Sequence, residues 1–217
     1  MVEISGSMRN WPFFQLAITT PRLVLRYPSL DDLDELADRA AEGVHEAGAM
    51  PFLFPWSDAA PAERARSTIQ YHFRKWGELS ADEWSMDFVV VFEGQVVGTQ
   101  NVGASDFALL REVSTGSWLG RRFQGRGIGT EMRAAVLHLA FEGLGAEYAT
   151  TEAFADNHSS LAVTGKLGYS EAGITRRKRQ GEPAVTRNFR LARADWKNPV
   201  EGIEIRHLAP CLPLLGL

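Results

Sequence analysis

The chain has 217 residues, of which 45% are hydrophobic, so it is long and apolar enough to bury the core of a single domain. Its formal net charge of −4 and isoelectric point of about 5.8 argue against a dedicated nucleic-acid-binding or membrane-surface protein. With one cysteine, no signal-peptide pattern and no membrane-spanning run, the sequence predicts a cytoplasmic protein without internal disulfides.

The chain opens with residues 1–18, which we expect to form an irregular extension whose apolar side chains pack on a neighbouring surface or a second subunit. The run 23–25 is rich in β-formers and predicts a first strand. A helix is expected from about residue 30 to residue 41, because Ser29 or Asp31 can cap its first turn and apolar residues then recur at helical spacing.

Residues 50–56, with the sequence MPFLFPW, are predicted to form a loop because two prolines exclude a helix. Their large apolar side chains could fold back on the core or line an acceptor pocket, and the sequence does not choose between these alternatives. A second helix is predicted over 61–78, with Pro61 in its first turn. We expect its apolar face to comprise Ile69, Phe73 and Trp76. His72 in this helix is interpreted as a partly buried structural residue.

The next segments alternate between strand and helix patterns. In chain order we predict strands 84–92, 95–102 and 112–119, a helix after residue 127, a strand at 148–154, a short helix at 157–167 and a final hairpin of strands 174–179 and 188–191. This order is typical of one mixed α/β domain, to which we assign residues 19–197. Residues 198–217 are an apolar, proline-broken tail that we expect to pack on the domain or on another subunit.

The most informative stretch is QGRGIG at residues 124–129, which lies between the strand 112–119 and the following helix. The apolar face of that helix is Ile128, Met132, Ala135, Val136, Leu139 and Ala140. A glycine turn that opens a helix leaves the first helical N–H groups unpaired at the positive end of the helix dipole. The absence of Cβ atoms lets an anion approach the backbone, so the stretch predicts a phosphate-binding loop.

Other phosphate-binding loops fit this stretch poorly. A Walker loop ends in Gly-Lys-Ser/Thr, whereas this chain reads GIGT. A dinucleotide loop needs a third glycine where this chain has Thr130, and no repeated βαβ pattern surrounds it. A plain tight turn remains the structural alternative, although each added glycine costs about 0.5–1 kcal/mol on folding.

The pattern Q-x-x-G-x-G of this stretch resembles the acyl-CoA pyrophosphate loop of the GNAT N-acyltransferases. Two further segments match in order, namely DNHSS with KLGY at 156–169 and TPRLVLR at 20–26, the latter similar to the opening of the RimJ/RimL branch. Together the three segments extend over most of residues 19–196.

The resemblance implies a GNAT fold, with a mixed, mostly antiparallel sheet, flanking helices and two central parallel strands that splay apart where they end near Leu119 and Phe154. It also implies an acyl-CoA-dependent N-acyltransferase that moves an acetyl group, or another acyl group such as succinyl, from CoA to a primary amine. The amine would belong to a protein N-terminus, a lysine or a small molecule, and would attack directly in a ternary complex. We expect neither a metal nor a nucleic-acid partner, and we expect a homo-oligomer.

The resemblance also assigns residues to the cofactor. Those expected to bind acyl-CoA are Trp118, Leu119, Arg121, Gln124, Gly125, Arg126, Gly127, Ile128, Gly129, Thr130, Asn157 and Ser160. The loop amides would hold the pyrophosphate, and Arg121, Arg122 and Arg126 would add positive charge or remain solvated. Backbone groups of Trp118 and Leu119 would pair with pantetheine, and the Leu119 amide could polarise the thioester carbonyl. Asn157 would bond to the pantetheine arm, cap the next helix, or do both.

The catalytic residues are less well defined by the sequence. Many GNAT enzymes carry a tyrosine seven residues after the matching asparagine as the acid for the thiolate, but here that position is Thr164. Ser160 is therefore the candidate to hydrogen-bond to sulfur, unless it is an ordinary surface serine. Candidate general bases are Glu112 and Glu182, with Glu152 as a third possibility.

The run RRKR at 176–179 is either a solvated face or a cationic lining that faces the acyl or acceptor end of the site. A cationic lining would suit a carboxylated acyl group, which is the reason for including succinyl-CoA. A non-catalytic acyl-CoA sensor or scaffold is the alternative function, because intact binding motifs do not by themselves imply turnover.

Overall fold

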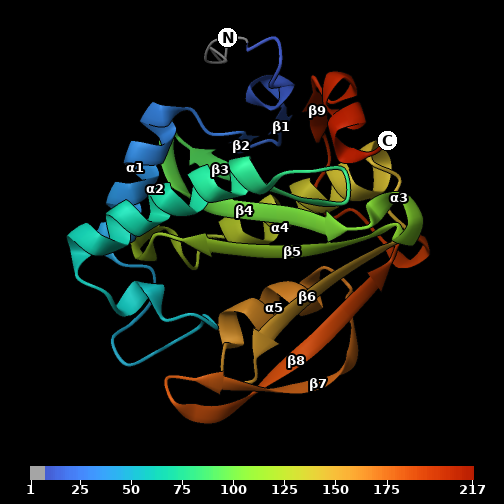
Figure 1. The fold of residues 1–217 in the computed structure, drawn as a ribbon. Helices are drawn as coiled ribbons and strands as arrows, with labels where there is room; N and C mark the ends of the chain where they lie inside the picture. The colour runs from blue at the N-terminus through green and yellow to red at the C-terminus, as the bar shows by residue number, and fades with distance from the viewer. Residues whose placement is uncertain (1–7) are drawn as a thin grey trace.

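The structure is a computed structural model and describes residues 8–217. Within these residues a sheet of nine strands has the order β7-β8-β6-β5-β4-β3-β2-β1-β9. Helices α1 and α2 cover one face of this sheet, and α4 and α5 lie on the other (Figure 1). All strand pairs are antiparallel except the central pair of β5 and β6. The prediction of a mixed, mostly antiparallel sheet with flanking helices is confirmed.

The strands are β1 (Ala17–Thr19), β2 (Leu23–Arg26), β3 (Glu83–Phe92), β4 (Gln95–Ser105), β5 (Glu112–Leu119), β6 (Tyr148–Phe154), β7 (Ser170–Arg179), β8 (Glu182–Ala192) and β9 (Glu204–Arg206). The helices are α1 (Leu30–Glu42), α2 (Pro61–Glu78), α3 (Phe107–Leu110), α4 (Ile128–His138) and α5 (His158–Lys166). A π-helical turn, η4 (Leu139–Gly143), continues α4. The 3₁₀ turns are η1 (Pro12–Gln15), η2 (Trp56–Asp58), η3 (Arg121–Phe123), η5 (Arg193–Asp195) and η6 (Ala209–Leu215).

Helix α1 begins at a capping box. The Ser29 hydroxyl accepts from the Asp32 N–H at 3.1 Å, and the Asp32 carboxylate accepts from the Ser29 N–H at 3.0 Å. Ser29 is therefore the cap, not the alternative Asp31. Arg26 at the end of β2 also pairs with Asp32 at 2.6 Å. Burial acts to raise the pKa of this carboxyl, but hydrogen bonds from Arg26 and Ser29 outweigh burial and lower the pKa.

Helix α2 has the predicted bounds, but its predicted apolar face is wrong in part. His72 is 1% exposed, whereas Phe73 is 47% exposed. Trp76 does face inward and stacks on Tyr27, with ring centroids 5.6 Å apart. The buried side of α2 turns toward a polar part of β3 that contains Asp87, so polar residues rather than a full apolar stripe occupy it.

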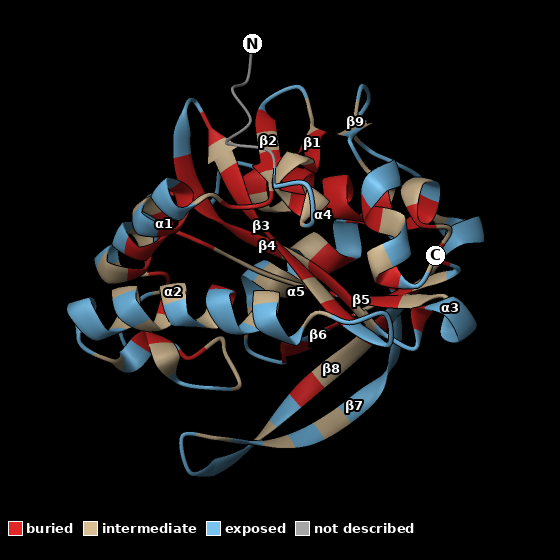
Figure 2. Cartoon of the chain, turned by 45° about the horizontal axis from the view of Figure 1, so that its top comes forward, coloured by how far each residue is buried: buried red, intermediate tan, exposed pale blue. Residues whose placement is uncertain are grey.

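The main hydrophobic core lies between the sheet and α4. Figure 2 shows that the central strands and α4 are mostly buried, whereas the hairpin β7–β8 is largely exposed. Ile128 and Met132 on the predicted face of α4 belong to this core. The first residues of α4 are thereby fixed against the sheet, at the end where the glycine-rich loop precedes the helix.

The two parallel strands separate along their length. β5 and β6 pair only from Glu112 opposite Tyr148 to Ser114 opposite Thr150. Beyond that point β5 continues on β4 as far as Leu119, and β6 continues on β8. The predicted splay of the central strands is thus confirmed. It leaves one edge of each strand without a strand partner, and we refer to the space between them as the slot.

Both apolar ends of the described chain pack on the domain itself. Phe13 and Leu16 are buried in the core near the N-terminal end, and β9 pairs with β1 at the edge of the sheet. Further along the tail, Cys211 and Leu215 are buried. Burial raises the pKa of the Cys211 thiol to about 11. None of the helices within residues 8–217 is both long enough and apolar enough to span a bilayer.

Candidate active site

The glycine-rich loop has the backbone geometry of an anion-binding turn. Gly125 and Gly127 have φ values of 72° and 80°, which side chains rarely adopt, and Gly127 is the N-cap of α4. The first main-chain hydrogen bond recorded at this end runs from the Glu131 N–H to the Gly127 carbonyl at 3.2 Å. The N–H groups of 128–130 therefore precede the helical bonding pattern and are free to bind an anion. Gly129 has ordinary φ, and an added Cβ would make only normal contacts.

Gln124 anchors this loop. Its side-chain amide donates to the Leu119 carbonyl at 3.0 Å and to the Val44 carbonyl at 2.8 Å. These two bonds connect the loop to the end of β5 and to the segment after α1. The first residue of the motif therefore positions the loop through its side chain.

A second anchor comes from the start of the chain. Arg22 donates through Nε to Glu131 at 2.7 Å and through Nη1 to the carbonyl of Arg126 at 3.3 Å. The Thr20 hydroxyl also donates to Glu131 at 2.6 Å. These bonds neutralise a carboxylate in the first turn of α4, where a free negative charge would repel a phosphate. The sequence alone did not predict this clamp on Glu131, although the segment TPR at residues 20–22 contains both of its donors.

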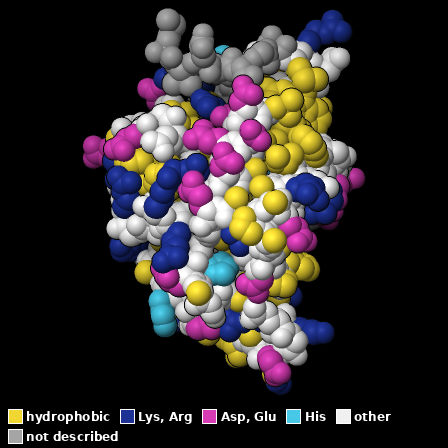
Figure 3. Space-filling view, turned by 90° about the vertical axis from the view of Figure 1, so that its left-hand side faces the viewer, with side chains coloured by type: hydrophobic (Ala, Val, Ile, Leu, Met, Phe, Trp, Pro, Cys, Tyr) yellow, Lys and Arg dark blue, Asp and Glu magenta, His cyan; other side chains and the backbone are white. Residues whose placement is uncertain are grey.

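The three loop arginines differ in their partners. Arg121 pairs with Glu46 at 2.8 Å and Arg122 lies 3.7 Å from Glu42. Arg126 lies over the ring of Phe92 at 5.0 Å and takes part in none of the ion pairs recorded within residues 8–217. Figure 3 shows Lys and Arg side chains interspersed with Asp and Glu on the face it displays. Arg126 is thus the loop arginine with the least compensated charge.

The edge of β5 that faces the slot presents backbone groups of alternate residues. The carbonyl of Trp118 points toward β4, where a Cβ added at Gly98 would collide with it. The carbonyl of Thr115 points the other way and accepts from the Thr151 hydroxyl of β6 at 3.1 Å. By this alternation the backbones of Ser117 and Leu119 face the slot.

Helix α5 borders the slot on the side of β6. Asn157 is its N-cap, and its side-chain oxygen accepts from the Ser160 N–H at 3.1 Å. The capping interpretation of Asn157 is confirmed, and the cap leaves its amide N–H groups available to a ligand. Ser160 is half-buried, and its hydroxyl has no recorded partner within residues 8–217.

A buried arginine lies between α4, α5 and β5. Arg133 is 4% exposed and donates to the Thr164 hydroxyl at 3.0 Å and to the Ser117 hydroxyl at 3.5 Å. Its Nε has no partner, and no ion pair recorded within residues 8–217 involves it. Burial lowers the pKa of this guanidinium. Sequence reasoning missed Arg133 because nothing marks a charged residue on an apolar helix as buried.

The candidate bases lie in different places. Glu112 pairs with Arg190 at 2.7 Å, at the closed end of the slot. Glu152 pairs with Arg177 at 3.0 Å. Glu182 is exposed at the start of β8, at the tip of the β7–β8 hairpin.

The basic run at the end of β7 alternates between exposed and half-buried side chains. Arg177 and Arg179 are half-buried, and Arg179 is bonded through both Nη atoms to Asp156, with the shorter distance 2.7 Å. This bonding lowers the pKa of the Asp156 carboxyl. Since Arg177 pairs with Glu152, both inward arginines already have acidic partners, so this part of the run is not an open cationic lining.

A polar pocket of about 740 Å³ opens on the face of the sheet that α2 covers. Its walls are Tyr71, Lys75, Glu78, Leu79, Glu83, Trp84, Ser85, Asn101, Gly103, Ala104, Ser105, Leu110, Glu112, Val113, Ser114 and Thr150. Glu112 is the one candidate base among these walls. Ser114 and Thr150 are the last paired residues before the slot opens, so the pocket reaches the closed end of the slot.

The loop 50–56 does not contribute to this pocket. Met50 is buried, whereas Phe54 is exposed. Trp56 covers Trp118 of β5, with ring centroids 5.6 Å apart. The loop therefore folds back over the C-terminal half of β5 and leaves the face of its N-terminal half to the pocket.

These parts form a phosphate-binding helix start, a slot between splayed parallel strands and a pocket at the closed end of the slot. Together they define the class of acyl-CoA-dependent acyltransferases. The profile of the acetyltransferase (GNAT) domain matches residues 22–170, which is more than half of the chain. The chain belongs to the GNAT acetyltransferase family, and it is an N-acyltransferase that uses an acyl-CoA.

Individual relatives are more distant. The putative ribosomal N-acetyltransferase YdaF of Bacillus subtilis is 25% identical over 154 residues, which cover 71% of this chain and 81% of that protein. Mycobacterium smegmatis RimJ, solved in complex with CoA-disulfide, has a TM-score of 0.68 at 16% identity, covering 94% of this chain and 95% of its own. The microcin C7 self-immunity acetyltransferase MccE, solved with acetyl-CoA and AMP, has a TM-score of 0.61 at 17% identity. The match covers 79% of this chain and 93% of that chain. At these identities the solved structures support the fold alone.

Proposed function

We propose that this protein transfers an acetyl group from acetyl-CoA to a primary amine by direct attack in a ternary complex. The observation that carries the proposal is the run of unpaired N–H groups at 128–130, preceded by two glycines with positive φ and lying beside the slot. The pyrophosphate would bind these amides, and Arg126 would supply the added positive charge.

The pantetheine arm would follow the slot-facing edge of β5. We assign its main-chain contacts to Ser117 and Leu119 in preference to Trp118, whose carbonyl faces β4. The carbonyl of Leu119 is already bonded to Gln124, so its N–H would be the group that polarises the thioester oxygen. The free amide hydrogens of Asn157 would bond to the arm from the side of α5.

In the reaction the amine nitrogen forms a bond to the acyl carbon and the carbon–sulfur bond breaks. The nitrogen loses one proton, and the departing thiolate gains one. The hydroxyl of Ser160 would donate a hydrogen bond to sulfur at the slot. Of the candidate bases we favour Glu112, which lines the pocket, over Glu182, which lies at the exposed hairpin tip; it would act through pocket water because Arg190 already holds its carboxylate.

The acyl group we favour is acetyl. A succinyl carboxylate would need an uncompensated cation near the acyl end, and both inward arginines of β7 already have acidic partners. The acceptor class is suggested by the relatives that carry names of ribosomal-protein acetyltransferases, so a protein N-terminus is the first amine to test. A cytoplasmic location and a homo-oligomer stay predictions.

The test is the thermal shift produced by acetyl-CoA, succinyl-CoA and CoA in the wild type, in Gly127→Glu and in Gly127→Ala. The glutamate adds a carboxylate to the phosphate site, so it should abolish the shift. The alanine adds backbone strain and a Cβ 3.3 Å from Nη2 of Arg22, but no charge. It serves as the matched control, because it should retain part of the shift. We expect acetyl-CoA to shift the unfolding temperature at least as much as succinyl-CoA.

The same proteins are then assayed for release of CoA thiol with peptides that have free N-termini. Binding without thiol release from any amine would favour the non-catalytic sensor or scaffold. If folded wild-type protein showed no shift with any of the three ligands, the proposed function would be wrong.

A further inference from the structure

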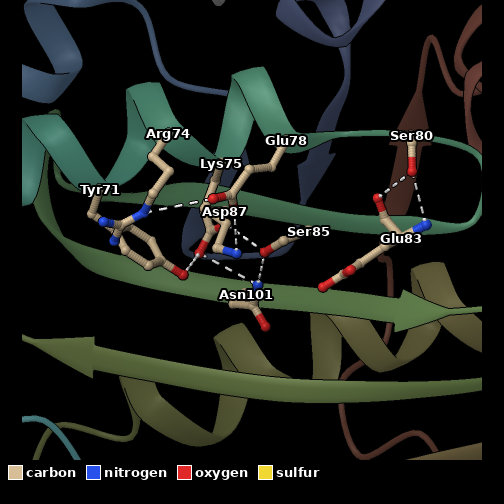
Figure 4. Close-up of polar contacts among 9 residues, drawn as sticks. All are labelled: Tyr71, Arg74, Lys75, Glu78, Ser80, Glu83, Ser85, Asp87 and Asn101. Atoms are coloured by element: carbon tan, nitrogen blue, oxygen red, sulfur yellow. Dashed lines mark hydrogen bonds and ion pairs between the residues drawn. The ribbon is translucent and has the colours of Figure 1, made fainter.

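Three side chains that line the pocket beside β5 are bonded to a buried carboxylate behind its wall (Figure 4). Asp87 on β3 is 3% exposed and accepts from the Tyr71 hydroxyl at 3.0 Å, the Ser85 hydroxyl at 2.6 Å and the Asn101 amide at 3.3 Å. No ion pair recorded within residues 8–217 involves Asp87. Three uncharged donors from three elements therefore hold a buried negative charge directly behind the pocket wall.

This network fixes the orientation of Asn101. An ionised carboxylate only accepts hydrogen bonds, so the atom of Asn101 that faces Asp87 must be its amide nitrogen. The same nitrogen donates to Ser85. The side-chain oxygen of Asn101 then points away from both residues, on the side of β5, as Figure 4 shows. It has no recorded partner within residues 8–217, and Asn101 lines the pocket.

The register of the sheet aligns this oxygen with the slot. Asp87 is opposite Asn101, and Asn101 is opposite Gly116 on the next strand. Gly116 lies just beyond Ser114, the last residue of β5 that pairs with β6. A Cβ added at Gly116 would meet nothing within 4 Å, so the space above it is open. The side-chain oxygen thus lies next to an open point of the strand where the slot begins.

The charges around the pocket favour a cation. One lysine, Lys75, lines it together with three glutamates, Glu78, Glu83 and Glu112. Arg190 compensates Glu112 at 2.7 Å, so Glu83 is the glutamate of these walls without a recorded ion pair within residues 8–217. Lys75 is itself paired with Glu78 at 2.8 Å. A ligand that carries an ammonium group would be attracted to these walls, whereas a carboxylate would be repelled.

From these observations we propose that this pocket is the acceptor site and that Asn101 is its amine-orienting residue, held in place by Asp87, Ser85 and Tyr71. The inference rests on the acetyl transfer proposed above. The acceptor is a primary amine on a polar, positively charged chain. Its N–H donates to the Asn101 side-chain oxygen, which turns the nitrogen lone pair over Gly116 toward a thioester in the slot. Asp87 does not touch the acceptor and is a positioning residue.

The first test is a titration of ¹⁵N-labelled protein, with CoA present, using tetra-alanine amide as the probe. Its Nα-acetylated form, which lacks the ammonium group, is the control ligand. We expect the Gly116 amide and the Asn101 side-chain signals to shift with the free amine and not with the control. Absence of these shifts, or equal shifts with the control ligand, overturns the proposal.

The second test separates acceptor recognition from cofactor binding. Gly116→Val fills the open space, so it should abolish the Asn101 side-chain shifts. Asn101→Leu removes the oxygen at similar volume, so it should abolish the Gly116 amide shift. Each variant should lower kcat/KM for peptides with a free N-terminus by about tenfold to a hundredfold. The KM for acetyl-CoA should stay within about twofold, as it should in the control Gly165→Ala, which also adds a methyl group in open space.

The outcomes distinguish this inference from the proposed function. If Asn101→Leu weakened the use of acetyl-CoA as much as the use of the peptide, Asn101 would be merely structural, and the inference would be wrong. Suppose that the wild type binds CoA and transfers acetyl groups to peptides, and that both variants do so equally well. The acceptor would then bind elsewhere, and the inference would be wrong. If CoA failed to bind at all, the proposed function would fail, whereas the probe titration would still report on the pocket.

Discussion

Two residues that can carry positive charge are buried without an acidic partner at hydrogen-bond distance, and they lie on opposite faces of the sheet. Arg133 donates only to hydroxyls on the face of α4. His72 on α2 is 1% exposed, and its Nδ1 has no partner. Burial lowers the pKa of His72 below its ordinary value of 6.5, although the negative charge of Asp87 acts in the opposite direction. The folded state therefore favours neutral His72.

The sign of the resulting pH dependence follows from this shift. Between the lowered folded pKa and 6.5 the unfolded chain binds the proton more readily, so the free energy of unfolding should fall as the pH falls below 6.5. His72→Leu lacks this titration and should show a smaller slope. Urea unfolding of both proteins at pH 7.5 and pH 5.5 measures this change in the free energy of unfolding. Both pH values lie above the range in which ordinary carboxyl groups titrate. An equal slope in wild type and variant would contradict the assignment.

At the scale of elements, local signals predicted the helix starts well, whereas β8 begins at Glu182 and not at the predicted residue 188. Ser29 and Pro61 indicated the starts of α1 and α2, and α2, β5 and β6 have the predicted bounds. The strand β7 is longer than the predicted 174–179, because the strand continues through an irregularity at Gly173, where φ is 112°. The predicted strand began only after that glycine, at residue 174. The predicted face of α2 failed because burial there depends on β3 and not on helical periodicity.

In the candidate site, too, features formed by contiguous residues could be predicted, and features formed by residues far apart in the chain could not. The phosphate-binding loop could be predicted because all its residues are contiguous. The network of Tyr71, Asp87 and Asn101 could not, because it forms only when α2, β3 and β4 come together. Arg22 and Glu131 are likewise more than a hundred positions apart, and only the folded chain brings them into contact.

The turn η4 offers a test of how the C-terminal tail docks. A Cβ at Gly143 would lie 2.8 Å from Cδ2 of Leu208 and 3.2 Å from Cδ1 of Ile205, so the ends of these tail side chains would have to shift. Gly143→Ala should therefore destabilise the protein by about 1–3 kcal/mol and release the tail. Gly165→Ala, in a helix with open space around it, should be neutral or stabilising. Thermal unfolding and limited proteolysis measure both, and equal behaviour of the two variants would contradict tail docking at η4.

At the scale of the whole molecule, the site depends on segments from the entire described chain. The turn between β1 and β2 supplies Arg22, the centre supplies the loop and slot, and the β7–β8 hairpin reaches the segment after α1. Arg179 donates to the Met50 carbonyl at 3.3 Å, and Gln180 donates to Asp58 at 2.7 Å. Contacts of such long sequence separation make the geometry of the site a property of the complete fold.

This dependence predicts a remote effect on cofactor binding. Arg22→Met removes the clamp on Glu131 and frees that carboxylate beside the phosphate site, so the Kd for CoA should rise by roughly fivefold or more at low salt. Arg193→Met removes an exposed pair with Glu142 and is the matched control. Isothermal titration of CoA into both variants measures the change. Equal Kd values in wild type and Arg22→Met would show that the clamp has no role in binding.

The pairing of β9 with β1 has a consequence for synthesis. Among the strands within residues 8–217, β1 is translated first, and its partner on the open edge, Glu204–Arg206, is translated last. A nascent chain therefore carries an unpaired edge strand, together with the apolar surface that later covers Cys211 and Leu215, until the ribosome has made almost the entire sheet. Residues 204–215, which are made after the other strands described here, thus close both the edge of the sheet and the exposed side of the core.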